Sequence, residues 1–203
     1  VRQWRPAGGA AAPGSHPPAN HSPAFSPDGT QIAFVSNRDG SYQIYVVDTD
    51  GKTPPRRLTA GRAYEGVPTW SQNGAQIAFT SDRLDPTTPR LFVMNADGTS
   101  PAVVPDTLRA DRPSWSPLGD KIAFTCGSTA PYNICAFDTH TNQVQPLRAP
   151  DGFSSEQPVF AANGRHIAFK TNRWGKDQIA IMDLKGSIQR QITNAGTNTF
   201  PAW

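Results

Sequence analysis

At residues 23–34 the chain reads PAFSPDGTQIAF, and this stretch decides the fold because it returns along the sequence in altered form. The copies are PTWSQNGAQIAF from Pro68, PSWSPLGDKIAF from Pro113, PVFAANGRHIAF from Pro158 and the stub PAW from Pro201. Successive copies begin 45, 45, 45 and 43 residues apart. A period of this length is typical of the four-stranded blade of a β-propeller.

Each repeat reads as four short strands in chain order. A segment that ends in Pro and an aromatic residue leads into a turn with Gly, such as Gly29, because a tight turn requires a positive φ. A second strand carries Ile-Ala-Phe, a third ends in Asp or Asn, and a shorter, more polar fourth closes the unit. No stretch has the period of an amphipathic helix. We therefore predict an all-β fold, a β-propeller of four blades of about 45 residues that start near residues 23, 68, 113 and 158, plus a partial fifth repeat from residue 201.

The Ile-Ala-Phe strand and the aromatic residue before the turn are expected to form the core. Ile and Phe lie on one face of the strand and Ala on the other, as in a strand buried between adjacent blades. The aromatic position recurs in phase with this pattern, which favours buried packing over a stacking platform for nucleic acid or sugar. Its occupants are Phe25, Trp70, Trp115, Phe160 and Trp203.

Residues 1–22 are rich in Pro, Gly and Ala and have no strand or helix period, so we expect a tail or tether ahead of a propeller at residues 23–203. Trp4, between Arg2 and Arg5, is the one candidate anchor in this tail, and the alternative is an exposed side chain. Because the chain starts at Val1, we expect a processed chain or a piece of a longer one.

Charge and hydropathy exclude two classes of protein. The net charge of +3 comes from 19 basic and 16 acidic residues spread along the chain, without the basic cluster expected of a nucleic-acid binder. No apolar run approaches the ~20 residues that span a bilayer, so we expect no transmembrane segment.

The repeat Pro-x-aromatic-Ser-Pro-Asp-Gly-x-x-Ile-Ala-Phe, followed by a strand ending in Asp, an Asp-Gly turn and an Arg-rich Leu-Thr strand, resembles the TolB-type WD-like β-propeller repeat. The first copy matches almost throughout, whereas later copies depart at Gln72, Leu118 and Ala161-Ala162. The resemblance implies a propeller, often extracytoplasmic in bacteria, that works by binding other macromolecules. Similar repeats also occur beside peptidase domains and in cell-envelope proteins.

This chain has four full repeats, whereas propellers of this family usually have six blades or more, so the repeat number does not decide how the propeller closes. The stub at residues 201–203 could pair beside the first repeat and close a four-bladed ring. The alternatives are an open arc completed by a partner or second copy, and a fragment of a longer propeller. We favour a single four-blade body held against protein neighbours, since an open arc exposes two apolar blade faces.

The sequence contains none of the common catalytic motifs: no G-x-S-x-G, no H-E-x-x-H and no G-x-x-x-x-G-K-[ST]. The four histidines are scattered, and the Asp-Gly pairs lack calcium-loop spacing. We therefore predict a protein that is not an enzyme, with no catalytic residues, no metal site and no cofactor.

Cys126 and Cys135 are the only cysteines, and both lie in the third repeat. If Phe124 faces Cys135 across a hairpin, Cys126 lies on the same face one pair further along, and a small register shift around Ala130-Pro131 would bring the two cysteines opposite each other. This geometry permits a disulfide, which would favour an oxidising compartment. Two buried free thiols are the alternative.

The residues just before each repeat's Pro differ between repeats, and in a propeller they would lie near the mouth of the axial channel. Variable side chains on a rigid scaffold are where recognition can be built, although unconstrained loop residues are the alternative reading. The candidate binding residues at this inner rim are His21, Tyr64, Glu65, Asp111, Arg112, Glu156 and Gln157.

Two hypotheses for function follow. The first is a non-catalytic, periplasmic or otherwise extracytoplasmic bacterial propeller that acts as an interaction or scaffold subunit of a cell-envelope or membrane-associated complex. Its partners would be other protein subunits, with no nucleic acid. The second is the propeller portion of a larger enzyme, such as a prolyl-oligopeptidase-like peptidase, where it would gate a catalytic domain absent from this chain.

Overall fold

A computed structural model describes residues 17–147 and 151–202, and the described residues form sixteen strands in four antiparallel sheets. Each sheet is one blade, and its strands follow one another in chain order. The blades are blade 1, β1 (Asn20–Phe25), β2 (Gln31–Ser36), β3 (Gln43–Asp48) and β4 (Arg56–Arg57); blade 2, β5 (Glu65–Trp70), β6 (Gln76–Ser81), β7 (Arg90–Asn95) and β8 (Ala102–Val103); blade 3, β9 (Asp111–Trp115), β10 (Lys121–Cys126), β11 (Asn133–Asp138) and β12 (Gln143–Pro146); blade 4, β13 (Ser155–Phe160), β14 (His166–Thr171), β15 (Gln178–Asp183) and β16 (Ile188–Gln191).

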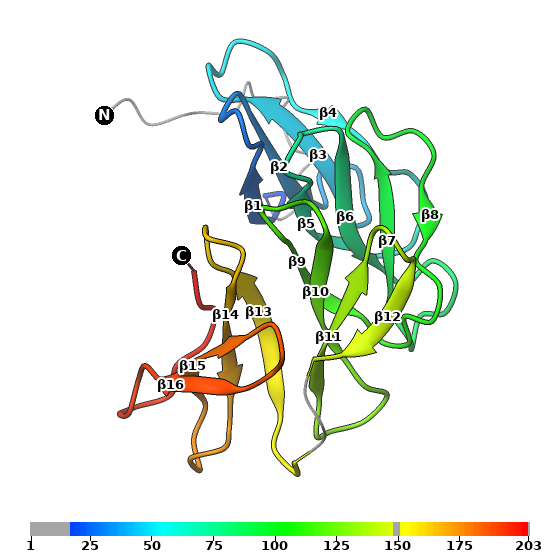
Figure 1. Ribbon diagram of the computed structural model, residues 1–203. Helices are drawn as coiled ribbons and strands as arrows, with labels where there is room; N and C mark the ends of the chain where they lie inside the picture. Colours follow the sequence, from blue (N-terminus) through cyan, green and yellow to red (C-terminus); the bar gives the residue numbers. More distant parts are fainter. Residues whose placement is uncertain (1–16, 148–150, 203) are drawn as a thin grey trace.

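The first strand of every blade is the innermost. Figure 1 shows β1, β5, β9 and β13 gathered at the centre, whereas β4, β8, β12 and β16 lie at the periphery. The all-β prediction and the four-blade count are confirmed.

The turn between the first two strands is held by a short network of side chains. Ser26 Oγ donates to Asp28 Oδ1 at 2.6 Å and accepts from the Gln31 backbone N–H at 2.9 Å, while Gly29 takes φ = 71°. Such a positive φ favours glycine. In blade 3, where Leu118 replaces the aspartate, Ser116 Oγ instead donates to Asp120 Oδ1 at 2.8 Å.

Adjacent blades pack through two unlike faces. The first, which we call the bulky face, carries the aromatic residue of the inner strand with the Ile and Phe of the second strand. The second, the small face, carries the alanine of the second strand and aliphatic residues of the third. In the first interface the bulky face of blade 2 covers the small face of blade 1, and the core consists of Ala33, Ile44 and Val46 from blade 1 with Trp70, Ile77, Phe79, Phe92 and Met94 from blade 2.

The same arrangement recurs in the other two interfaces. Blade 3 places Trp115, Ile122 and Phe124 over Ala78 and Leu91 of blade 2. Blade 4 places Phe160, Ile167 and Phe169 over Ala123, Ile134 and Ala136 of blade 3. Blades 2 and 3 therefore use both faces, and the order along the chain is always a bulky face on the preceding small face.

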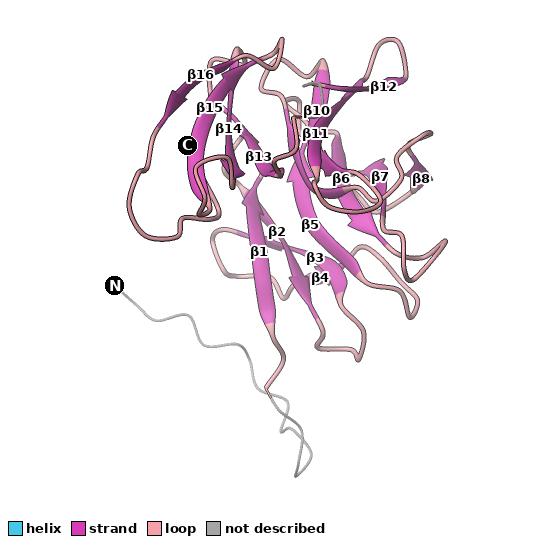
Figure 2. Ribbon diagram, turned by 90° about the horizontal axis from the view of Figure 1, so that it is seen from below, coloured by secondary structure: helices cyan, strands magenta, loops and turns pink. Residues whose placement is uncertain are grey.

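The four blades form an open arc and not a ring. In the part of the chain that the structure describes, no strand of blade 4 pairs with a strand of blade 1. Figure 1 shows an opening between these blades on the left, and the view from below in Figure 2 shows them as separate sheets. Of the two predicted alternatives, the four-bladed ring closed by the stub is therefore excluded and the partial propeller is confirmed.

The open arc also corrects one part of the predicted core. Phe25 is 65% exposed, whereas its counterparts Trp70, Trp115 and Phe160 are 7%, 8% and 6% exposed. The reason is that no blade precedes blade 1 in the described chain, so nothing covers its bulky face. Trp203 lies outside the described residues.

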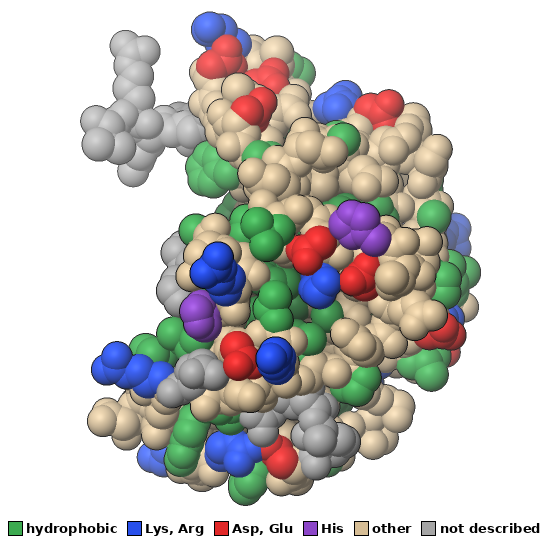
Figure 3. All heavy atoms as spheres, viewed as in Figure 1, with side chains coloured by type: hydrophobic (Ala, Val, Ile, Leu, Met, Phe, Trp, Pro, Cys, Tyr) green, Lys and Arg blue, Asp and Glu red, His purple; other side chains and the backbone are tan. Residues whose placement is uncertain are grey.

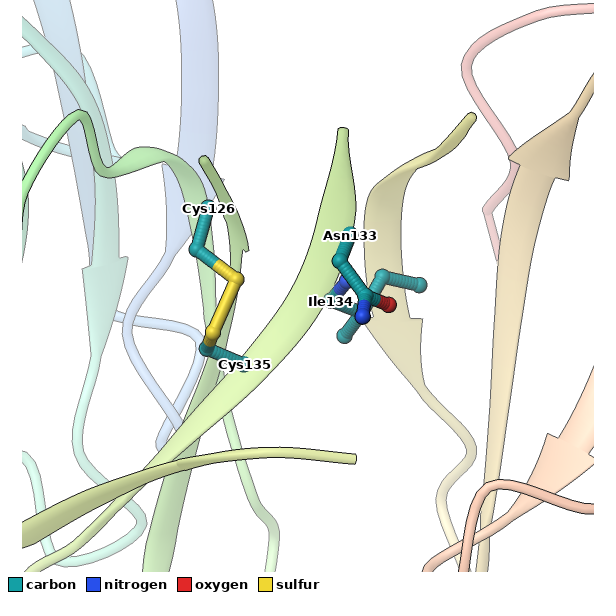
Figure 4. The surroundings of a disulfide bond; sticks show 4 residues. All are labelled: Cys126, Asn133, Ile134 and Cys135. Carbon is teal, nitrogen blue, oxygen red and sulfur yellow. A yellow bond between two sulfur atoms is a disulfide. The ribbon is translucent and has the colours of Figure 1, made fainter. Parts of the chain in front are cut away.

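The two cysteines of blade 3 are joined by a disulfide (Figure 4). Phe124 pairs with Cys135 and Cys126 pairs with Asn133, so the sulfurs meet diagonally across the hairpin with a Cα–Cα distance of 5.8 Å. The expected register shift is not needed, because the 5.8 Å between the two Cα atoms already lies in the usual range for a disulfide. Both cysteines belong to the buried cluster between blades 2 and 3.

We expect equivalent substitutions in blades 1 and 2 to differ in cost. Phe79 is 0% exposed in the first interface, so Phe79→Ala should lower the free energy of unfolding by about 3–5 kcal/mol. Phe34, at the same repeat position in blade 1, is partly exposed, and Phe34→Ala should cost clearly less. Urea denaturation of both variants measures the difference; equal costs would contradict the open arc.

The disulfide predicts how the two cysteines react with an alkylating reagent before and after reduction. Protein secreted to an oxidising compartment should take up no alkylating label until it is reduced, and then two labels per chain. Replacing both cysteines by alanine should lower the free energy of unfolding by roughly 2–4 kcal/mol. Mass spectrometry of alkylated, folded protein is the measurement, and two labels before reduction would mean that the cysteines are free thiols.

Candidate functional site: the entry-side rim

A bulge marks the point where the chain enters each blade. The pairing of first and second strands shifts register just before the proline in all four blades, and the residue before that proline has a positive φ. Bulges re-aim side chains and are frequent beside functional sites. The bulge residues are Ser22, Val67, Arg112 and Gln157, and Phe200, just before Pro201 of the stub, repeats the conformation with φ = 57°.

Three of these bulge residues, from different blades, meet near the centre of the arc. The Arg112 guanidinium carbon lies 4.6 Å from the centre of the Phe200 ring, although blade 4 lies between them in sequence. The Phe200 N–H donates to Gln157 Oε1 at 2.7 Å. An arginine over an aromatic face is an attractive pair worth ~0.5–1 kcal/mol at exposed sites. Arg112, Gln157 and Phe200 therefore form one cluster at the axis.

A row of rings continues the rim across blades 1 and 2. The His21 and Tyr42 ring centres lie 5.3 Å apart, and those of Tyr42 and Tyr64 lie 5.9 Å apart. Burial raises the pKa of the Tyr64 phenol above its usual value, and the nearby charge of Asp111 acts in the same direction. We call the set His21, Tyr42, Tyr64, Asp111, Arg112, Gln157 and Phe200 the entry-side rim.

Beneath the rim, blade 2 holds a buried carboxylate. The Glu65 side chain is 1% exposed and pairs with Arg83, whose Nη2 lies 3.0 Å from Glu65 Oε1. Arg83 also covers the rings of Phe79 and Phe92. Burial raises the pKa of Glu65 above its usual value, although the hydrogen bond from Arg83 and its charge act to lower it. Glu65 thus supports the bulge from below.

Blade 4 has a comparable support. Lys170 Nζ lies 2.9 Å from Glu156 Oε1 and 3.4 Å from Asp177 Oδ2. Burial acts to lower the pKa of Lys170, but the hydrogen bond and charge of Glu156, with help from Asp177, raise it above its usual value. The Asp177 carbonyl accepts the Asn198 N–H at 2.8 Å, so the residue that takes part in this ion cluster also holds the segment that leads into the stub.

The structure brings the sequence-predicted rim residues into two groups. His21, Tyr64, Asp111, Arg112 and Gln157 belong to the exposed or half-buried rim, while Glu65 and Glu156 lie in ion pairs. Sequence reasoning missed Tyr42, which lies in the loop before β3. One signal was available in the sequence: a tyrosine lies just ahead of the third strand in two repeats, at Tyr42 and Tyr132. In the structure their carbonyls accept the N–H of Glu65 and Ser155, where the next blade begins.

Three further expectations concern the same chain. Trp4, the predicted tail anchor, lies outside the described residues. Among residues 17–147 and 151–202, no group of three His, Cys, Asp or Glu side chains could hold a metal ion. Within those ranges there is also no helix with the length and apolar character needed to cross a membrane.

The buried Glu65 gives a pH dependence with a defined sign. A carboxyl whose pKa is raised by folding adds stability below its unfolded value of 4.5, and this contribution is lost as the pH rises through the folded pKa. The free energy of unfolding of the native protein, minus that of the Glu65→Gln variant, should therefore fall as the pH rises above this value. Urea denaturation from pH 4 to pH 8 measures it, and parallel curves would show that the fold does not raise this pKa.

Residues 8–203 match the family model of the TolB beta propeller domain. The structure is similar to that of a putative TolB from Agrobacterium tumefaciens, with a TM-score of 0.81 and 22% identity, over 92% of this chain and 66% of that one. TolB from Acinetobacter baumannii gives a TM-score of 0.74 and 22% identity, over 84% of this chain and 42% of that one.

A 58-residue segment, 28% of this chain, is 41% identical to Tricorn protease homolog 1 of Streptomyces coelicolor and covers 5% of it. The chain thus spans about two thirds or less of each of these proteins. The family match covers nearly the whole chain, and the fold and the repeat agree with it. The protein belongs to the family of TolB β-propeller domains.

Proposed function

We propose that this protein is a non-catalytic β-propeller that binds another protein at the entry-side rim. In this proposal it is an interaction or scaffold subunit of a bacterial cell-envelope or membrane-associated complex outside the cytoplasm. The observation that carries the proposal is the cluster of Arg112, Gln157 and Phe200 at the axis, continued by the aromatic row from His21 to Tyr64.

The composition of the rim favours a protein partner. Tyrosine and arginine are enriched at the energetic centres of protein interfaces, because each offers a large contact area together with a polar tip. Here Tyr42 and Tyr64 are half-buried, and Phe200 is 62% exposed. The rim lies on the bulges of a rigid β scaffold, so little conformational entropy is lost when a partner binds.

The disulfide supports a location outside the cytoplasm. Stable disulfides persist in oxidising compartments such as the periplasm and are rare in the cytosol, where thiols are kept reduced. Cys126 and Cys135 are 8% exposed in the blade 2–3 interface, where the disulfide is part of the packed core.

Site-specific photo-crosslinking tests the rim. A photoreactive amino acid at Tyr42 or His21 should crosslink to the same protein in cells of the natural host, because both positions lie in one row. Ala75, exposed on a turn at the opposite end of the strands, is the matched control and should give no such product. Crosslinks that are equally frequent at Ala75, or absent at both rim positions, would contradict the proposal.

A charge reversal sharpens the test. Arg112→Glu removes the cation over Phe200 and places a second negative charge beside Asp111. We expect the crosslink from Tyr42 to fall about tenfold, as for the loss of an arginine at the centre of an interface. Lys52→Glu, at a side chain that is 82% exposed in the β3–β4 loop, is the control and should leave the crosslink unchanged.

A second candidate function rests on one specific observation. The 41% identity to Tricorn protease homolog 1, although limited to 58 residues, favours a propeller that gates access to a peptidase domain of a longer protein. The coding sequence on either side of this chain distinguishes the two candidates. A G-x-S-x-G segment in a following domain, with peptidase activity of the longer protein, would favour the second.

A further inference from the structure

Two pockets recur at the end of the strands opposite the entry-side rim, where the turn joins the first strand of each blade to the second. The pocket between blades 1 and 2 has a volume of about 430 Å³, and the pocket between blades 2 and 3 has a volume of about 270 Å³. Sites for small ligands commonly measure ~300–1,000 Å³, so the first lies within this range and the second just below it. We call them the first and second turn pockets.

The same repeat positions build both pockets. They are the serine that begins the turn, the acid or amide two residues later, the glutamine that begins the second strand, and the tryptophan of the next blade. These residues are Ser26, Asp28, Gln31 and Trp70 in the first turn pocket and Ser71, Asn73, Gln76 and Trp115 in the second. Gln72 and Asn73 line both pockets, so the turn of blade 2 lies between them.

Hydrogen bonds within the turns fix the polar groups of the pocket walls. Asn73 Oδ1 accepts from Ser71 Oγ at 2.8 Å and from the Ala75 N–H at 3.0 Å. The oxygen of this amide is thus used inside the turn, which leaves the Nδ2 donor on the other side of the amide for a ligand. Gln31 Nε2 donates to Asp48 Oδ1 at 3.1 Å, which leaves Gln31 Oε1 as an acceptor.

The third interface is closed at the same place. Above Gly74 and Gly119, the nearest atom of the neighbouring turn would lie 3.9 Å and 4.0 Å from an added Cβ. Above Gly164, Leu118 Cγ would lie at 2.7 Å. A leucine at the acid-or-amide position thus fills the space that stays open in the first two interfaces.

The chemistry common to both pockets favours an uncharged ligand with several hydroxyl groups. Amide and hydroxyl side chains donate and accept hydrogen bonds, as sugar hydroxyls do. The described residues that line the pockets include no lysine or arginine, and Asp28 repels an anion in the first pocket. The second has Asn73 in that place, so attraction of a cation is not shared. On the face that Figure 3 shows, acidic and basic side chains are interspersed and form no large patch of one sign.

Apolar surface completes each pocket. Trp70 and Trp115 are 7% and 8% exposed, so a small part of each ring remains accessible. Pro27 adds exposed apolar surface to the first pocket and Leu118 to the second. Ligand sites combine apolar surface with a few placed polar groups. A sugar ring matches this combination, because it carries C–H groups beside its hydroxyls.

We propose that the first and second turn pockets are adjacent subsites for an uncharged saccharide chain that lies across the turn of blade 2. Gln72 and Asn73 contact the chain between the subsites, and Trp70 and Trp115 form the two floors. This inference does not depend on the proposed function of the rim, which lies at the other end of the strands.

Titration with uncharged hexasaccharides, followed by NMR of the tryptophan indole N–H groups, tests the proposal. The probes are maltohexaose, cellohexaose and N-acetylchitohexaose, each at up to about 10 mM, which detects even weak binding. At least one should shift the Trp70 and Trp115 signals saturably, while Trp174, 41% exposed in blade 4, stays unchanged. Hexagalacturonate should shift the Trp70 signal less, because its carboxylates come close to Asp28.

The turn of blade 3 supplies a matched variant of blade 1. Asp28→Leu with Thr30→Asp gives blade 1 the Ser-Pro-Leu-Gly-Asp turn of residues 116–120. Because blade 3 folds with this turn, the thermal midpoint should change little. The Trp70 shift should be lost, and the Trp115 shift should remain.

The same exchange in blade 2 affects both subsites. Asn73→Leu with Ala75→Asp should abolish the Trp115 shift and weaken binding at Trp70 about tenfold, since the turn of blade 2 lines both pockets. Asn163→Leu with Arg165→Asp makes this exchange in blade 4, away from both pockets, and should change neither shift.

The proposal fails if none of the three uncharged hexasaccharides shifts either indole signal. It fails equally if hexagalacturonate shifts the Trp70 signal as strongly as the best uncharged probe, since the site would then not select against charge. Shifts that persist in both the blade 1 and the blade 2 variants would place the saccharide elsewhere on the protein.

Discussion

The structure depends on one packing rule: a face of Ile, Phe and an aromatic ring must lie on a face of Ala and aliphatic residues from the preceding blade. A single four-stranded sheet with apolar residues on both faces cannot bury them alone, so each blade needs a neighbour on both sides. Ile77 and Phe79 on one face and Ala78 on the other satisfy this rule within one strand. The alanine lets the sheets approach, and the large side chains fill the space, at roughly 1.5–3 kcal/mol for each buried side chain.

The same rule determines where the protein can vary. Residues of the bulky and small faces are constrained because they pack against the neighbouring blade. The residue in the bulge before each proline, in contrast, is not paired with the second strand. Ser22, Val67, Arg112 and Gln157 occupy this one position with four unlike side chains. Because the position lies at the axis, residues from different blades reach each other, as Arg112 and Phe200 do. The side chains that differ most between blades are therefore gathered at the axis.

The features that recur within every repeat could be predicted from the sequence. The features that depend on whether another blade lies next to a given blade could not. Ile-Ala-Phe and the Gly turn predict strands, pairing and blade order, since these follow from period-2 alternation and turn geometry. The exposure of Phe25 could not be predicted, because the repeat specifies how a blade meets its neighbour and not whether a neighbour exists. Tyr42 was missed for a related reason: it joins the rim through space, from a loop whose composition differs in every blade.

Blade 3 shows how much chemical change the packing rule allows. In blades 1 and 2 an arginine, Arg38 or Arg83, covers the ring at the third-strand position. Blade 3 has neither that arginine nor that ring, and the disulfide lies in the same buried region of the bulky face. Its turn also differs, because Leu118 lies over the next blade so closely that a Cβ at Gly164 would be 2.7 Å from Leu118 Cγ. The φ of 65° favours glycine at position 164, and a larger residue there would also have to displace the exposed Leu118 side chain, so the side chain in one blade bears on the sequence of the next.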